Sequence, residues 1–121
     1  MTNEQIRNNL RERYENGERD FYSPNLRGSD LSGMQLMECD LSNSNLDKSD
    51  LYGINLWSSD LRGASLIGAS LINATLCECD FRGADITNAD FRGADLNGAD
   101  FRGVDLTVAN FNHTDLEGVI K

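Results

Sequence analysis

Large apolar side chains recur at every fifth position through most of the chain. Steps of five residues from Phe21 reach a Leu, Ile or Phe every time, as far as Leu116. These steps hold 20 of the 26 Leu, Ile and Phe residues in the sequence. A helix repeats its faces every 3.6 residues and a strand every 2, so a period of five fits neither. The pattern indicates an internal repeat.

The other positions of the five-residue unit also have preferences. The residue two before each large apolar one is mostly Ala, Ser or Cys, which predicts a second inward position beside a bulky neighbour. Asp or Asn usually precedes the apolar residue, and Gly stands two residues after it in ten units. These residues favour turns. Since one unit cannot bury its single large side chain alone, we expect the units to stack as a solenoid with a continuous core.

These units resemble those of the pentapeptide repeat proteins, which follow Ala-(Asp or Asn)-Leu-x-x. Residues 89–93 (ADFRG) and 94–98 (ADLNG) match that rule, and the resemblance covers about residues 19–118. It implies an all-β solenoid: a right-handed quadrilateral parallel β-helix with four units in each coil. The repeats would then make about five coils, roughly 24 Å long at a strand spacing of about 4.8 Å.

The N-terminal residues do not follow the repeat. Thr2 and Gln5 have the spacing of a capping box, and we predict a short α-helix over about residues 3–16. Its apolar face would hold Ile6, Leu10 and Tyr14. The chain thus divides into a capping helix with linker (1–20) and a β-helix (21–121). The helix is expected to cover the first coil, because an open end exposes core and unpaired backbone groups; a separate partner-binding helix is the alternative.

Composition argues against several functional classes. The formal net charge of -9 disfavours direct binding to nucleic acid or to an anionic membrane. No apolar stretch has the length expected of a signal peptide or a membrane span. Three cysteines without the spacing of a zinc site or a disulfide framework fit a reducing compartment. We therefore expect a cytoplasmic protein that contacts neither nucleic acid nor membrane directly.

No catalytic or metal-binding constellation is expected. The predicted interior is filled by Leu, Phe and Ala, and polar groups are spread over convex faces, so no pocket would host a reaction. His113 is the one histidine and falls at an outward position, where a solvated side chain is expected. The Gly-rich repeat of calcium-binding β-rolls is missing. We predict a protein that is not an enzyme and takes no cofactor and no metal.

Several large side chains depart from the polar character of the outward positions. Stacking of residues twenty apart would align them in adjoining columns. Contiguous exposed apolar groups often mark a contact surface, where aromatic residues and Met are favoured. Incidental surface hydrophobicity is also common, so both interpretations remain open. The candidate contact residues are Met37, Tyr52, Trp57, Ile67, Ile72 and Cys77.

Charged residues form a further outward pattern. Arg62, Arg82 and Arg102 would stack beside a column of aspartates that also repeats every twenty residues. We interpret the pattern as a ladder that relieves repulsion between the stacked carboxylates, and a recognition surface is the alternative.

The apolar residues of the last coil predict a second contact surface. Its apolar side chains would face water at the C-terminal end, where a second copy could bury them about a two-fold axis. We expect a weak homodimer through this end. The candidate residues are Phe101, Leu106, Phe111, Leu116, Val119 and Ile120.

Two functions fit these observations. The favoured one is a non-enzymatic interaction or scaffold module for an unknown protein partner. The alternative follows from the resemblance alone, since some pentapeptide repeat proteins imitate a DNA duplex and inhibit or protect DNA gyrase. A short shaft and the arginines in its acidic surface disfavour that alternative.

Overall fold

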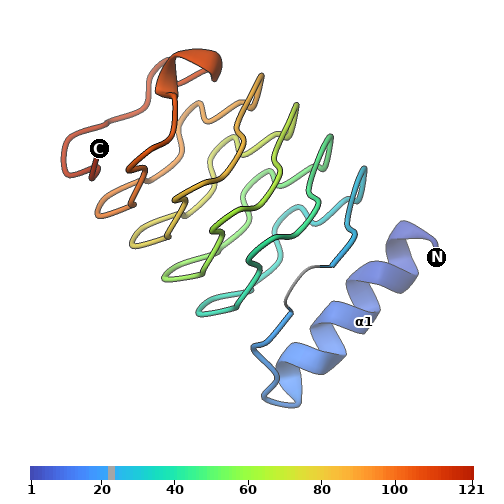
Figure 1. The fold of residues 1–121 in the computed structure, drawn as a ribbon. Coiled ribbons are helices and arrows are strands. Elements are labelled where there is room, and N and C mark those ends of the chain that lie inside the picture. Colours follow the sequence, from blue (N-terminus) through green and yellow to red (C-terminus); the bar gives the residue numbers. More distant parts are fainter. Residues whose placement is uncertain (22–23) are drawn as a thin grey trace.

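The computed structural model describes residues 1–21 and 24–121, and it begins with one α-helix (Figure 1). Helix α1 spans Asn3–Glu15. Thr2 Oγ1 accepts a hydrogen bond from Gln5 N (3.1 Å), and Thr2 N donates to Gln5 Oε1 (2.8 Å). This is the predicted capping box, and the predicted helix is confirmed.

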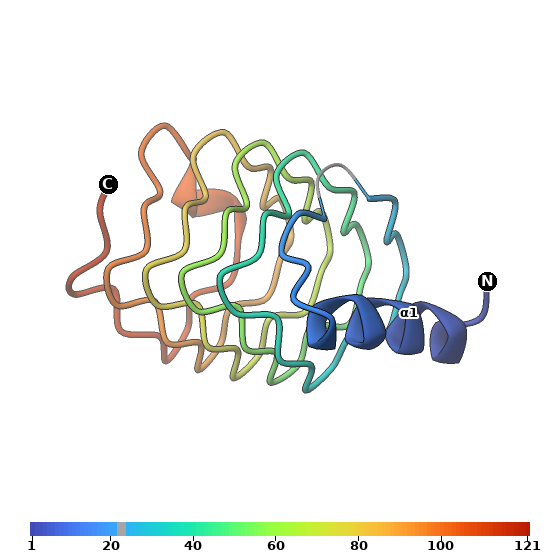
Figure 2. The ribbon, with the colours of Figure 1, turned by 90° about the horizontal axis from the view of Figure 1, so that it is seen from below.

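Helix α1 lies across the first coil (Figures 1 and 2). Leu10 is buried, and the other two predicted apolar residues of the helix pack against the same core. Tyr14 Oη donates to the Met37 carbonyl (3.1 Å), and Arg7 Nη1 donates to the Ser32 carbonyl (2.9 Å). No earlier coil exists to pair with these carbonyls, so the helix satisfies them. The expected lid is present.

The rest of the chain winds into stacked coils of twenty residues, which Figure 2 shows from below. Parallel bridges join residues twenty apart, from the pair of Asp20 and Asp40 to the pair of Asp100 and Ile120. Each side of a coil contributes an isolated bridge, and the described residues form no longer strand. The register confirms four five-residue units in each coil.

The large apolar residue of each unit fills the interior. From Phe21 to Phe101 every one of these side chains is buried. The position two residues earlier also points inward, as predicted, and in the first two coils it holds the larger Met34 and Ile54, which are both buried. In the later coils Phe replaces Leu at some of the buried centres, and the residue two before the centre is mostly Ala. A larger ring at the centre leaves less room for the side chain two residues earlier, so the two side chains together fill a fixed volume.

The phenylalanines form two parallel stacks inside the later coils. The rings of Phe81 and Phe101 lie 4.5 Å apart between centroids, and those of Phe91 and Phe111 lie 4.8 Å apart. Rings of different stacks meet edge to face, at 6.0 Å between Phe91 and Phe101. Both arrangements are favourable for aromatic pairs, so the stacks tie the last coil to the one before it.

The corners of the coils need a left-handed backbone. The second residue after each buried centre has a positive φ at every described unit except one. The exception is Val108, where the chain forms a short 3₁₀-helix, η1 (Leu106–Val108), instead of the turn. A β-branched side chain is strongly disfavoured at positive φ. The β-branched side chain therefore accounts for the interruption.

The interruption changes how the last coil joins the one before it. Asn88 N donates to the carbonyl of Val108 (2.8 Å), whereas the equivalent amide one coil earlier, Gly68 N, donates to Thr87 (2.9 Å). Among the described residues, a parallel bridge joins this coil to the one before it at Asn110, but none does so at Asp105 or Asp115. The predicted β-helix therefore continues through the last coil, but this coil departs from the regular register of the others.

Candidate protein-contact surface

The six candidate contact residues each follow a buried centre, at the corners of the coils. Trp57 N donates to Asn55 Oδ1 (3.1 Å), and the Trp57 carbonyl accepts from Glu38 N (2.8 Å). Tyr52 N donates in the same way to Asp50 Oδ1 (3.0 Å). The corners of Trp57 and Tyr52 are thus each fixed by a side chain of their own unit and by an amide of the preceding coil. Side chains at these positions project from a rigid frame.

Two aromatic residues are the most exposed of the six. Tyr52 is 50% exposed and Trp57 is 41% exposed. Tyr52 Oη accepts a hydrogen bond from Asn73 Nδ2 (3.1 Å), which holds the ring toward the next coil. The other four are half-buried: Met37, Ile67, Ile72 and Cys77. All six therefore reach the surface, as the pattern predicts.

The register distributes the six residues over three corners. We number the sides of the solenoid by their units, so that the fourth side consists of residues 34–38, 54–58, 74–78, 94–98 and 114–118. Its corner holds Met37, Trp57 and Cys77, joined by backbone hydrogen bonds between successive coils. Tyr52 and Ile72 follow the third side, whereas Ile67 follows the second. The column of Trp57 is thus one of three, and the six residues do not share one corner.

The thiols of the molecule are not poised for reaction. Burial raises the pKa of Cys39 to about 11 and that of Cys79 to about 12. Partial burial, and then a hydrogen bond with Asp95, raise the pKa of Cys77 as well. All three cysteines are free. A thiolate is the reactive form, so at neutral pH these residues act as small apolar side chains.

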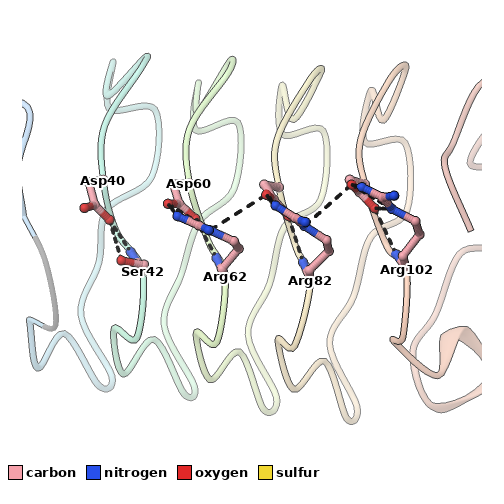
Figure 3. Close-up of polar contacts among 8 residues, drawn as sticks. Asp40, Ser42, Asp60, Arg62, Arg82 and Arg102 are labelled. Atoms are coloured by element: carbon pink, nitrogen blue, oxygen red, sulfur yellow. Dashed lines mark hydrogen bonds and ion pairs between the residues drawn. The ribbon is translucent and has the colours of Figure 1, made fainter.

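The first side of the solenoid carries the predicted ladder of opposite charges (Figure 3). Arg62 Nη2 lies 2.7 Å from Asp60 Oδ2 in its own coil, and Arg62 Nε lies 3.8 Å from Asp80 in the next. Arg82 repeats this arrangement with Asp80 and Asp100. Hydrogen bonds from the arginine that follows each aspartate lower the pKa values of the Asp60 and Asp80 carboxyls. The alternation of charge is confirmed.

A hollow with a volume of about 660 Å³ lies between the last two coils. Its lining includes Asp95, Asn97, His113, Asp115 and Glu117. The sequence does not predict this hollow, which opens where the last coil is not bridged to the previous one beside Asp115. The hollow is a surface depression. No group of three His, Cys, Asp or Glu side chains in residues 1–21 and 24–121 is arranged to hold a metal ion.

The candidate dimer end is less exposed than the sequence predicts. Phe101 is buried at 1% exposure, so its assignment to an open edge is wrong. The chain starts a sixth layer there, because Phe101 N donates to the Ile120 carbonyl (2.7 Å) and Ile120 N donates to Ala99 (2.8 Å). Ile120 itself is 45% exposed. The other four candidates are half-buried: Leu106, Phe111, Leu116 and Val119.

Sequence reasoning missed the hollow beside His113 and the exposure of Val108, which is 36%. The sequence holds a signal for the exposure of Val108, because this is the one β-branched residue at the corner position that otherwise holds Gly or a polar residue. None of the helices within the described residues has the length and apolar character needed to cross a membrane.

Comparison with protein families decides what this architecture is. The model of the pentapeptide repeats matches in eight copies, over residues 20–57, 59–98 and 84–120. The chain belongs to the pentapeptide repeat family. The fold is the β-helix of that family, and its members are generally non-catalytic.

Solved structures agree with this assignment. A pentapeptide repeat protein from the cyanobacterium Cyanothece 51142 (Rfr23) is 30% identical, with a TM-score of 0.73 and 93% of each chain covered. One from the Arabidopsis thaliana thylakoid lumen is also 30% identical, with a TM-score of 0.64; 81% of this chain is covered but only 63% of that longer one. QnrB1, a plasmid-mediated fluoroquinolone resistance protein, is 21% identical with a TM-score of 0.35, over 84% of this chain and 79% of that one. A comparison with curated proteins finds no match.

Proposed function

We propose that this pentapeptide repeat protein is a non-enzymatic interaction module that presents side chains to a protein partner. The observation that carries the proposal is the exposure of Tyr52 and Trp57 on corners that are hydrogen-bonded to neighbouring coils. Aromatic side chains supply large contact areas and are enriched at protein interfaces. A rigid frame lowers the entropy lost on association. The buried centres fill the solenoid and leave its interior no room for a substrate.

The proposal includes a cellular location. Three free cysteines, two of them buried, fit a reducing environment, so we place the protein in the cytoplasm. The formal net charge of -9 disfavours direct contact with nucleic acid or an anionic membrane. A protein partner is then the remaining class of macromolecule.

Site-specific photo-crosslinking in the native host tests the proposal. A benzophenone amino acid replaces Trp57 in one variant and Asn112 in another, because Asn112 is an exposed corner residue in the last coil. A discrete adduct is expected at Trp57 and none at Asn112. The purified partner should then lose binding to Trp57→Ala but keep binding to Asn112→Ala. Identical adducts at both positions, or unchanged binding to Trp57→Ala, would contradict the proposal.

The alternative function is imitation of DNA toward a topoisomerase. Stacked aspartates of the first side offer a column of carboxylates in its favour. Against it, Arg62 and Arg82 each contact carboxylates of two coils, so much of that charge is neutralised. A gyrase supercoiling assay with added protein separates the two functions. Inhibition, or protection from a gyrase poison, would favour imitation, whereas no effect is expected of an interaction module.

A further inference from the structure

The fourth side of the solenoid differs from the others in charge. Its units contain five carboxylates and no lysine or arginine, whereas each of the other three sides contains at least one arginine. No ion pair within the described residues involves any of the five. These carboxylates are Glu38, Glu78, Asp95, Asp115 and Glu117. The fourth side therefore carries carboxylates that form no ion pair among these residues, and the nearest arginines, Arg7 and Arg11 of α1, line a hollow with Met34 and Gln35 of its first unit.

The exposed tryptophan stands on the same side. Trp57 occupies the corner column, and Glu38 and Glu78 lie in the adjacent column, one coil before and one coil after its level. The Glu38 amide donates to the Trp57 carbonyl, so the two residues are held at neighbouring levels. The face of an indole attracts a cation, and the carboxylates of the adjacent column add to that attraction, although the Glu78 carboxylate itself points to the following coil and lies against Gly98. This combination suits a guanidinium or an ammonium group better than an apolar or anionic group.

The far end of the fourth side offers a second position for a cation. The hollow between the last two coils is lined by Asp95, Asp115 and Glu117, without a lysine or an arginine. Glu117, on the far wall of this hollow, lies three coils beyond Trp57, because the two residue numbers differ by sixty. At about 4.8 Å per coil this separation is roughly 14 Å. An extended peptide advances about 3.3 Å per residue, so about four residue steps span it.

We infer that the fourth side binds an extended segment of a partner protein that carries two arginine or lysine side chains about four residues apart. One cation stacks on Trp57 beside Glu38, and the other enters the acidic hollow. This inference rests on the proposed function, because it specifies the chemistry of the partner. The carboxylates of the fourth side favour a cationic segment over a neutral or acidic one, and the exposed ring of Trp57 supplies the contact area.

The single tryptophan of the chain makes the inference directly measurable. The probe is the blocked peptide Arg-Gly-Ser-Gly-Arg, titrated against the full chain while Trp57 emission is followed. Saturable change of the emission is expected, with binding weakened at least tenfold as salt rises from about 0.05 M to about 0.5 M. The peptide Glu-Gly-Ser-Gly-Glu should not bind. The shorter Arg-Gly-Arg reaches one position only and should bind several-fold more weakly.

Matched variants locate the site. Glu78→Gln and Glu117→Gln should each weaken binding of the peptide about threefold, and the double variant about tenfold. The control is Glu12→Gln on the exposed surface of α1, which removes the same charge and should leave binding unchanged. Calorimetry replaces fluorescence for Trp57→Ala, whose affinity should fall about tenfold. Far-ultraviolet circular dichroism confirms that each variant stays folded.

Three results would overturn the inference. Equal weakening by Glu12→Gln would mean that net charge alone attracts the peptide. Binding of spermidine as tight as that of the peptide would assign the side to a small polyamine rather than to a protein segment. A crosslinked partner whose contact with Trp57 holds no lysine or arginine would exclude the cationic segment and leave the interaction module intact. Absence of any partner at Trp57 is the separate failure of the proposed function.

Discussion

The coil of residues 61–80 and the coil of residues 101–120 have the same spacing of large apolar residues but different structures. The earlier coil is bridged to the next on every side, whereas the last contains η1 and is bridged back on fewer sides within the described residues. Gly68 and Val108 occupy the same corner column, and only Gly68 has a positive φ, of 67°. The buried centre is present in both. Regularity of a coil thus depends on the corner residue as much as on the apolar centre.

The largest expected effect compares a core residue of a regular coil with one of the last coil. Phe91 is fully buried in a regular coil, whereas its stacking partner Phe111 is half-buried in the last one. Phe91→Asp should bury an unpaired charge and unfold the protein, at a cost above about 5 kcal/mol. Phe111→Asp can keep its carboxylate in water and should cost only about half as much. Urea unfolding followed by circular dichroism measures both.

Asn97→Asp is the control for these two substitutions. Asn97 is exposed and lies outside the core, so the new carboxylate stays solvated. Its effect on the free energy of unfolding should be within about 0.5 kcal/mol. Equal tolerance of Phe91→Asp and Asn97→Asp would contradict the register that separates inward from outward positions.

Exchanging the corner residues of the two coils should exchange their behaviour. Gly68→Val forces a β-branched residue to a φ of 67° and should destabilise the protein by about 1–3 kcal/mol. A Cβ at Gly68 would meet Lys48 Cγ at 3.7 Å, an ordinary contact, so the cost lies in the backbone. Val108→Gly should replace η1 by the regular turn.

Hydrogen exchange measures the repair in Val108→Gly. The Asp85 amide donates to the Ala64 carbonyl (3.0 Å), but the equivalent amide of Asp105 has no such bond to Ala84. The Asp105 amide should exchange more slowly in the variant, since the restored bridge protects it. Unchanged exchange there would show that Val108 is not the cause of the interruption.

The sequence predicts the regular coils well because local rules decide them. The spacing of apolar residues predicts the inward centres, and the stacking of residues twenty apart correctly aligns Trp57 with Met37 and the arginines with their aspartates. The hollow beside Asp115 was not predicted, because it lies where Asp95 and Asp115 form no bridge and where Gly98 N donates to Gly118 rather than to Glu117. The burial of Phe101 was missed because the chain continues into a further layer at Ile120. Such features depend on which neighbour each backbone group finds, which a periodic pattern does not specify.

A smaller effect concerns the ladder that crosses from the regular coils into the last one. Arg102 donates a hydrogen bond that lowers the pKa of Asp100 to about 2, and the pKa values of Asp60 and Asp80 are lowered in the same way. A carboxyl whose pKa is lower in the folded state stabilises the fold above its unfolded pKa, and this contribution is lost as pH falls through the folded pKa. Stability should therefore decrease gradually from about pH 4 toward pH 2.

Urea midpoints measured across this pH range check the prediction. The variant with Arg62, Arg82 and Arg102 replaced by Gln lacks the donors and should show a shallower slope below pH 4. A slope that is the same in both proteins would assign the acid sensitivity to other carboxyls. The change should remain small, because the guanidinium groups are exposed and compete with water and salt.

The smallest expected effect is association through the last coil. Leu106, Phe111, Leu116 and Val119 are half-buried and Ile120 is 45% exposed, so this end presents more apolar surface than the covered first coil. Two such ends meeting about a two-fold axis would bury both at once. This end offers only a few partly exposed apolar side chains, so a weak homodimer is expected. Light scattering coupled to gel filtration should show a mass that rises with loading concentration, and Phe111→Arg should abolish the rise. A constant monomer mass at every concentration would refute the dimer, and loss of the dimer in Trp57→Ala instead would move the contact to the fourth side.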